Sequence, residues 1–458
     1  MIRKGMVGLR DSALAEIQWT GQMRERSACI VTHRQMIEGQ CPWCDRSIAS
    51  GQVTAPDSGV AEVRWDWDAI AGSLRAEDQE VRSLTVWNLS ALTTWVENVL
   101  PLMGLALSDT DPELRANAEA ACSRLGRDLS DAQVAWLESQ IGAQVHELPA
   151  RIMLLGKYFG SKTAEVRAKR AAHIYWIIER HPDSDIAGNS DTALFKFEEA
   201  TAYAPARELW LQQCAAKKSN ADVLGNAARF FVLNEPLTAE KLFLQAQTLE
   251  PGNPKWHELL AQLYSLSAKR GPEEMRSGKA RQALVELEMA EQIRTSHAGI
   301  PCGEESRTSE LLTRIHKLPN RARAAFDAGE LTFARQFANE CLAIATSPEI
   351  PEFFRGNGNA IHYGHLVLGR VALREGNLEV AKVHLIESGK TTGSPNLGSF
   401  GPNMSLAKEV LENGERAAVL EYLELCSVFW KSGSEMLTEW KEQIHQGKIP
   451  EFGANLNY

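Results

Sequence analysis

The chain has 458 residues and a formal net charge of −10 at pH 7, with 44% hydrophobic and 24% charged residues. This composition suffices to build cores and to solvate a surface, and the length exceeds what one compact core usually holds, so we expect several domains or an extended array. The acidic balance disfavours general binding to nucleic acid or to anionic membranes, because both need a surplus of Lys and Arg on one surface.

The sequence also indicates a compartment. Residues 1–16 carry basic side chains without an apolar stretch behind them, so they do not have the form of a signal peptide. The longest apolar run, 99–107, is interrupted by Pro101 and Gly104 and is too short to span a bilayer. The eight cysteines are mostly isolated and do not form the framework of a disulfide-rich secreted protein. We therefore predict a cytoplasmic protein without a membrane partner.

A group of metal-binding side chains lies in a small N-terminal module, which we expect to span residues 1–59. Its members are Cys29, His33, Cys41 and Cys44. Four such ligands usually hold a tetrahedral Zn²⁺, and a tight turn points both thiolates of a Cys-Pro-x-Cys segment to one side. The segment Cys41-Pro42-Trp43-Cys44 resembles a zinc-knuckle turn, so a structural zinc ion is the one cofactor that the sequence suggests.

Other interpretations of this module stay open. The spacing of Cys41 and Cys44 is also that of a glutaredoxin redox pair, but such a pair follows a β-strand, whereas residues 34–40 are polar and helical in character. A partial metal site completed from elsewhere, or two ordinary reduced cysteines, would fit as well.

Three similar tetrapeptides in residues 60–190 each open a predicted amphipathic helix. They are Gln79-Glu80-Val81-Arg82, Pro112-Glu113-Leu114-Arg115 and Ala164-Glu165-Val166-Arg167. Asp111 and Pro112 suit a helix start, because Asp caps free amides and Pro fits the first turn. The pattern resembles HEAT repeats, in which an Asp-Pro turn starts the second helix of a hairpin and an Arg reaches a neighbouring repeat. The charged, turn-rich segment 181–192 is the predicted boundary to the next array.

A five-fold register predicts helical hairpins in residues 191–458. A turn residue is followed by a small residue after five positions, a large residue after nine and a small residue after twelve, with Ala338 as the exception at the large position. The turn residues are Asn234, Gly278, Gly329, Gly376 and Gly414, and the residues that follow them are Ala239, Phe243 and Ala246; Ala283, Leu287 and Ala290; Ala334, Ala338 and Cys341; Ala381, Leu385 and Ser388; Val419, Leu423 and Cys426. A turn residue able to take positive φ ends the first helix, and small residues let the two helices approach closely.

This register resembles tetratricopeptide repeats, most closely in residues 220–254, where Phe230, Ala239, Phe243 and Pro251 match the family pattern. Successive turn residues lie farther apart than the family period of about 34 residues, and Lys269 to Lys279 is expected to be an insertion that lengthens one hairpin. Together the two resemblances imply an all-α solenoid, HEAT-like and then tetratricopeptide-like, behind the small cysteine module. They imply little about function.

The resemblance does indicate where a partner would bind. First helices of a tetratricopeptide array line its concave face, which implies a groove near Arg323, Phe326, Tyr363, Leu366, Arg370 and Arg374. Guanidinium groups and aromatic rings suit an extended acidic or C-terminal peptide. The polar loops 355–359 and 389–403 should be neighbours at one end of a hairpin, so Asn357, Asn359 and Asn396 are further candidate contacts. These side chains could instead cap helix ends.

We therefore expect a scaffold or adaptor that binds a protein or peptide partner in this groove. The alternative is an enzyme or enzyme subunit with its site in the 355–403 loops or the cysteine module. No catalytic arrangement can be read from the spacing of residues; His362 and His365 share a helical face and could bind metal with a third ligand, but such a pair is usually packed or solvated. Nucleic-acid binding by the cysteine module is disfavoured by the acidic balance. The sequence does not predict the oligomeric state.

Overall fold

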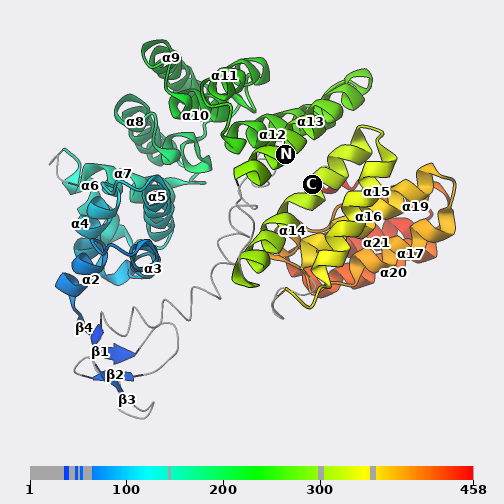
Figure 1. The fold of residues 1–458 in the computed structure, drawn as a ribbon, viewed down its shortest axis with the longest axis horizontal. Coiled ribbons are helices and arrows are strands. Elements are labelled where there is room, and N and C mark those ends of the chain that lie inside the picture. The colour runs from blue at the N-terminus through cyan, green and yellow to red at the C-terminus, as the bar shows by residue number, and fades with distance from the viewer. Residues whose placement is uncertain are drawn as a thin grey trace. The chain divides into compact units, whose positions relative to one another are not determined.

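The computed structural model of the chain describes residues 36–40, 47–49, 52–54, 64–142, 146–297, 304–350 and 357–456. Contacts divide the described residues into two compact units, one that ends at Glu250 and one that begins at Pro251. The described residues up to 250 are called the N-terminal unit and those from 251 onward the C-terminal unit (Figure 1).

A small antiparallel sheet opens the N-terminal unit. Its strands are β1 (Met36–Gln40), β2 (Ser47–Ala49), β3 (Gln52–Thr54) and β4 (Arg64–Trp65), in the order β3-β2-β1-β4. In the β2–β3 hairpin, Ile48 pairs with Val53. The expectation of helical character before Cys41 is wrong, because Met36–Gln40 forms a strand. A redox pair is therefore no longer disfavoured by helical character before Cys41.

From Trp67 onward the described residues form helices and no strand, which confirms the all-α expectation for this part of the chain. The helices of the N-terminal unit are α2 (Trp67–Ser73), α3 (Gln79–Leu89), α4 (Val96–Ala106), α5 (Pro112–Arg127), α6 (Asp131–Gln140), α7 (Glu147–Tyr158), α8 (Ala164–Arg180), α9 (Ala200–Ala216), α10 (Ala221–Phe231) and α11 (Pro236–Leu249), with short 3₁₀ helices η1 (Thr93–Trp95), η2 (Asp185–Gly188) and η3 (Ser190–Thr192). The predicted helix starts at Gln79, Pro112 and Ala164 are confirmed.

The segment 181–192 is a packed part of the N-terminal unit. Its helix η2 contacts α5, α8 and α10, and η3 contacts α7. The Asn226 amide on α10 donates to the carbonyls of Pro182 and Ser184 at 3.0 and 2.8 Å, so the turn-rich backbone is satisfied inside the fold. The predicted boundary at residue 190 therefore falls within this unit, which ends at Glu250.

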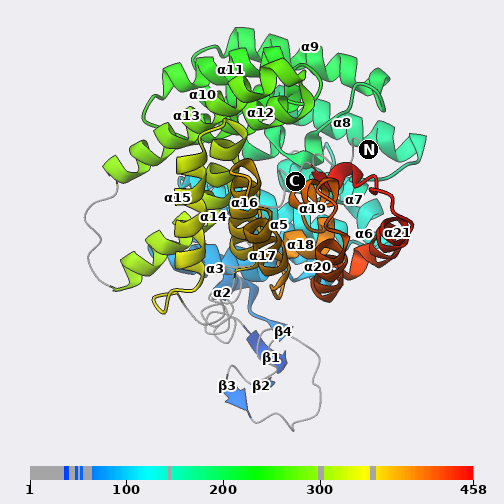
Figure 2. The ribbon, with the colours of Figure 1, turned by 90° about the vertical axis from the view of Figure 1, so that its right-hand side faces the viewer.

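The C-terminal unit is built from helices that pack against their neighbours in the chain. They are α12 (Pro254–Arg270), α13 (Glu273–His297), α14 (Glu304–Asp327), α15 (Leu331–Ala345), α16 (Gly358–Arg374), α17 (Leu378–Gly389), α18 (Pro395–Phe400), α19 (Ser405–Glu412), α20 (Arg416–Phe429) and α21 (Ser434–His445), with η5 (Lys431–Gly433) and η6 (Gly453–Leu456). Helix α12 packs on α13, α14 on α15 and α16 on α17, and Figure 2 shows α14 to α17 side by side. Among the residues placed by the structure, no helix combines the length and apolar composition needed to cross a membrane.

The predicted register coincides with the buried seam between paired helices. Every small and large position of the register is buried except Leu287, which is half-buried. Gly329, Gly376 and Gly414 lie between paired helices with φ of 83°, 77° and 88°, a region that favours glycine. These three turns and the close approach of the helices are as expected.

Two predicted turn residues behave differently. Gly278 lies inside α13, because α12 ends at Arg270 and α13 begins at Glu273. The insertion expected in this hairpin is therefore extra helix at the start of α13 and not a longer loop. Asn234 does connect α10 to α11, but its φ is not positive; instead its side chain donates to the Leu194 carbonyl at 3.0 Å and accepts from the Lys196 amide at 2.9 Å.

Candidate partner-binding surface

The residues of the expected groove lie on two helices that contact each other. Arg323 and Phe326 are on α14, and Tyr363, Leu366, Arg370 and Arg374 are on α16. Phe326 and Leu366 are only 5% and 2% exposed, so they belong to the core between the helices. Arg374 is exposed, whereas Arg323, Tyr363 and Arg370 are half-buried and border the solvent.

Cation–π contacts fix the arginines of this surface. The Arg323 guanidinium on α14 lies 4.8 Å from the centroid of the Tyr363 ring on α16. In the opposite direction, Arg370 and Arg374 on α16 lie 4.2 and 5.6 Å from the centroid of the Phe326 ring on α14. Each such contact is worth about 0.5–1 kcal/mol near solvent, so together they orient the side chains without neutralising their charge. We call Arg323, Phe326, Tyr363, Arg370 and Arg374 the arginine–aromatic surface.

The arginines of this surface differ in their ion pairs. Nε and Nη2 of Arg370 donate to Oε1 of Glu409 on α19 at 3.0 and 2.7 Å, and Asp327 lies 3.7 Å from Nη1. Arg323 and Arg374 make no hydrogen bond or ion pair with any residue that the structure describes, apart from their aromatic contacts. Two guanidinium groups thus remain available to an anionic ligand.

Lys269 on α12 is a further titratable side chain near these arginines, which sequence reasoning missed. Burial, followed by the nearby charge of Arg323, lowers the pKa of Lys269 well below its ordinary value, and Arg370 acts in the same direction. Asp327 partly opposes this effect. Lys269 was assigned to the expected insertion, but the effects of Arg323, Asp327 and Arg370 on its pKa place it close to this surface.

The two polar loops are neighbours, as their positions in the hairpin suggest. Oγ of Ser394 donates to Oδ1 of Asn359 at 2.8 Å. A Cβ atom at Gly358 would overlap the carbonyl oxygen of Gly393, so the loops approach closely enough to require glycine. Asn357 accepts a hydrogen bond from the amide of Ala360 at 3.1 Å and caps α16. Helix capping and loop-to-loop contact, the alternative left open by the sequence, therefore account for the side chains of Asn357 and Asn359.

Asn396 on α18 is not accounted for in this way. Its Oδ1 atom is buried and has no hydrogen-bond partner among the described residues. A buried amide oxygen without a partner is costly, which leaves Asn396 as the one loop candidate with an unused acceptor.

His362 has a structural position. Its Nδ1 donates to the carbonyl of Ser388, and its Nε2 accepts from the amide of Asn403, both at 3.1 Å. Burial lowers the pKa of His362 to about 4, so the ring is neutral near pH 7 and both nitrogens are used. His365 does not face His362; its Nδ1 lies 3.0 Å from Nδ1 of His384 on α17.

In the N-terminal unit, each of the three predicted helix starts has an arginine that makes the same kind of contact. Arg82 donates to the carbonyls of Ala76 and Glu77 at 2.7 and 3.0 Å, and Arg115 donates to those of Asp109 and Thr110 at 2.8 and 3.0 Å. Arg167 on α8 makes the corresponding bond to Ser161 at 3.3 Å. Each arginine is the fourth residue of its helix and satisfies carbonyls of the turn that precedes it.

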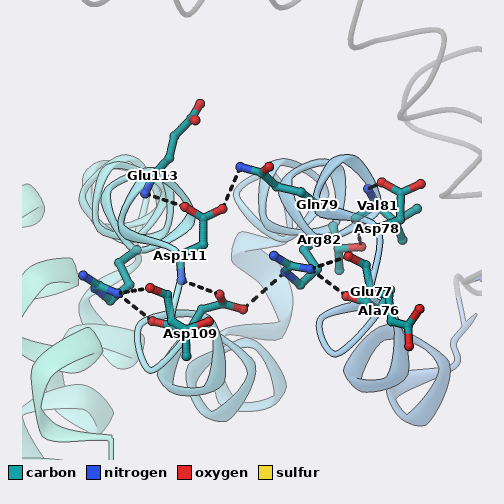
Figure 3. A network of polar contacts seen from close by, with 12 residues as sticks. Ala76, Glu77, Asp78, Gln79, Val81, Arg82, Asp109, Asp111 and Glu113 are labelled. Atoms are coloured by element: carbon teal, nitrogen blue, oxygen red, sulfur yellow. Dashed lines mark hydrogen bonds and ion pairs between the residues drawn. The ribbon is translucent and has the colours of Figure 1, made fainter.

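Side chains also join the start of α3 to the start of α5 (Figure 3). Nε of Arg82 lies 3.3 Å from Asp109, and Gln79 donates to Oδ2 of Asp111 at 2.7 Å. The other oxygen of Asp111 caps α5 by accepting from the amide of Glu113 at 2.9 Å. Nε of Arg82 is buried and has the ion pair with Asp109 but no hydrogen bond, whereas the other contacts are hydrogen bonds within the network. We interpret the network as a connection between helices and not as a ligand site.

The zinc prediction concerns residues that the structure does not describe. Cys29, His33, Cys41 and Cys44 all lie outside the described ranges. Within those ranges, no group of three or more His, Cys, Asp and Glu side chains is arranged to hold a metal ion.

Comparison with known proteins assigns no family. No protein-family model matches the chain, and no curated protein matches it significantly in sequence.

Proposed function

We propose that this protein is an interaction scaffold whose arginine–aromatic surface binds an acidic segment of a protein or peptide partner. The observation that carries the proposal is the state of Arg323 and Arg374, which lie against aromatic rings and lack an acidic partner among the described residues. The chain as a whole has a net charge of −10, but these two arginines form a local positive charge that attracts carboxylates.

The arrangement of the surface suits an acidic ligand in two ways. A guanidinium group can bind a carboxylate through two parallel hydrogen bonds, which gives both strength and orientation. Because the rings of Tyr363 and Phe326 already restrict the arginines, less side-chain entropy is lost when a ligand binds. Arg370 is neutralised by Glu409, so we assign it to holding α16 against α19 more than to direct ligand contact.

The buried register supports a tetratricopeptide-like array in the C-terminal unit. In the N-terminal unit, the contact of Arg82 with Asp109 before α5 supports a HEAT-like array, because an arginine of that family reaches the neighbouring repeat. Helical arrays of both kinds present extended surfaces and rarely carry catalytic clusters. In this proposal the protein acts in the cytoplasm as an adaptor, with the N-terminal unit offering a second surface. The enzyme alternative gains no support from the loops, where Asn357 and Asn359 serve the fold.

A peptide-binding experiment tests the proposal. Fluorescence anisotropy of a labelled hexaglutamate peptide should show at least about tenfold weaker binding to an Arg323→Gln/Arg374→Gln variant than to the unmodified chain, equivalent to about 1.4 kcal/mol. Arg276→Gln, at an exposed arginine of α13, is the matched control and should bind like the unmodified chain. Equal affinity of the double variant and the unmodified chain would contradict the proposal.

A further inference from the structure

His365 on α16 and His384 on α17 face each other within one helical hairpin. Their Nδ1 atoms are 3.0 Å apart, and their ring centroids are 5.3 Å apart with planes tilted by 35°. Gly369, one turn after His365, has no side chain, and a Cβ atom there would lie 2.4 Å from Cδ2 of Leu406 on α19 and 3.2 Å from Cβ of His384. Helix packing therefore holds the two half-buried rings in place.

Both imidazoles are in the form that binds metal ions. Burial lowers the pKa of His365 to about 4 and that of His384 below its ordinary value. The charges that face the pair are Glu387, which opposes both shifts, and Arg335, which strengthens the shift of His384. At pH 7 both rings are thus neutral; one Nδ1 carries a hydrogen and the other accepts it.

We propose that His365 and His384 form a binding site for Cu²⁺ or Ni²⁺, in which both Nδ1 atoms are ligands and solvent completes the coordination. Two nitrogens at about 2.0 Å from a metal and about 90° apart are separated by about 2.8 Å, whereas tetrahedral Zn²⁺ requires about 3.3 Å. The observed 3.0 Å lies between these values, so either geometry needs only a small adjustment of the side chains. Cu²⁺ and Ni²⁺ are favoured because they bind nitrogen ligands tightly among first-row divalent ions and accept square-planar or tetragonal sites completed by solvent.

Binding of the metal ion does not require the two histidines to release a proton. The hydrogen on the donating Nδ1 moves to Nε2 of the same ring, so both rings stay neutral and both Nδ1 lone pairs face the metal. Neither Nε2 has a hydrogen-bond partner among the described residues, so this change of tautomer breaks no other contact. The ion would join α16, which carries Tyr363 and Arg370, directly to α17.

Isothermal titration calorimetry with NiCl₂ tests the proposal. The full chain carries Cys41→Ser and Cys44→Ser, so that the thiols near the N-terminus do not contribute. This background protein should bind one equivalent of Ni²⁺, and a further His384→Gln change should weaken binding at least about tenfold. His445→Gln, at an exposed histidine of α21, is the matched control and should leave the affinity unchanged.

A spectroscopic measurement covers the case in which His384→Gln disturbs the fold. Electron paramagnetic resonance of the background protein with one equivalent of Cu²⁺ should show hyperfine coupling to two imidazole nitrogens, and to one fewer in His365→Gln. Absence of binding by the background protein, or equal affinity and equal spectra in the variants and the background, would overturn the proposal. Neither outcome bears on hexaglutamate binding, which reports on the arginine–aromatic surface alone.

Discussion

Replacing Glu119 with glutamine should remove a pH-dependent loss of stability from the N-terminal unit. Glu119 on α5 is 6% exposed; it accepts hydrogen bonds from the hydroxyl of Ser184 and, at 2.6 Å, from the amide of Ile186. Burial raises the pKa of Glu119 from 4.5 to about 7, with a further contribution from Asp185, and the two hydrogen bonds only partly oppose this change.

The sign and size of the effect follow from this pKa. Because the folded value lies above the unfolded value, the stabilisation from the protonated carboxyl is fully present below pH 4.5 and is lost as the pH rises through about 7. Linkage between the two values gives a loss of about 2 kcal/mol between pH 5.5 and pH 8.5. Glutamine has nearly the same shape and does not ionise, so Glu119→Gln should be more stabilising at pH 8.5 than at pH 5.5 by about this amount.

Hydrogen exchange with mass spectrometry along a urea titration measures the effect, read from peptides of α5 and η2. Comparison of the variant with the unmodified chain at each pH cancels the titration of groups that both share. Glu113→Gln, at an exposed glutamate of the same helix, is the control and should show less than about 0.5 kcal/mol of pH dependence. An effect of Glu119→Gln that is the same at both pH values would refute the reasoning.

Three further predictions concern stability. Gly278→Ala should raise the urea midpoint by the equivalent of about 1 kcal/mol, because this glycine lies inside α13 with open space around it. In contrast, Gly126→Ala should prevent folding of the N-terminal unit, because its Cβ atom would overlap a carbonyl of α7. Circular dichroism measures this loss of folding. His362→Phe should lower stability by about 2–3 kcal/mol in urea unfolding at pH 7, because it leaves a buried carbonyl and a buried amide without partners. Since the folded pKa of His362 is about 4, its contribution is full above pH 6.5 and is lost as the pH falls towards 4, and the variant should lack this dependence. Arg115→Ala removes two hydrogen bonds to the turn before α5 and should cost about 1–2 kcal/mol in the same assay. Arg180→Ala, at an exposed arginine of α8, is the control and should be neutral.

The sequence by itself determined the features that depend on neighbouring residues. The helix starts at Gln79, Pro112 and Ala164 could be predicted because a cap and a first turn involve only a few consecutive residues. The turns at Gly329 and Gly376 follow from the local need for positive φ. The buried seam could be read from spacing alone, because helical periodicity sets which residues share a face.

The tertiary structure decided the features that depend on contacts between distant elements. Gly278 lies inside α13, which begins at Glu273 and packs against α12, where the repeat pattern placed a turn. The partner of His365 is His384 on the next helix, and the charge of Arg370 is neutralised by Glu409 on α19. Both pairings depend on how helices pack, which is a sum of many contacts along each interface and leaves no trace in the spacing of one helix. For the same reason the sequence could not rank the six residues predicted to line a groove. The packing of α14 against α16 shows that Phe326 and Leu366 are buried, whereas Arg323 and Arg374 can contact a ligand.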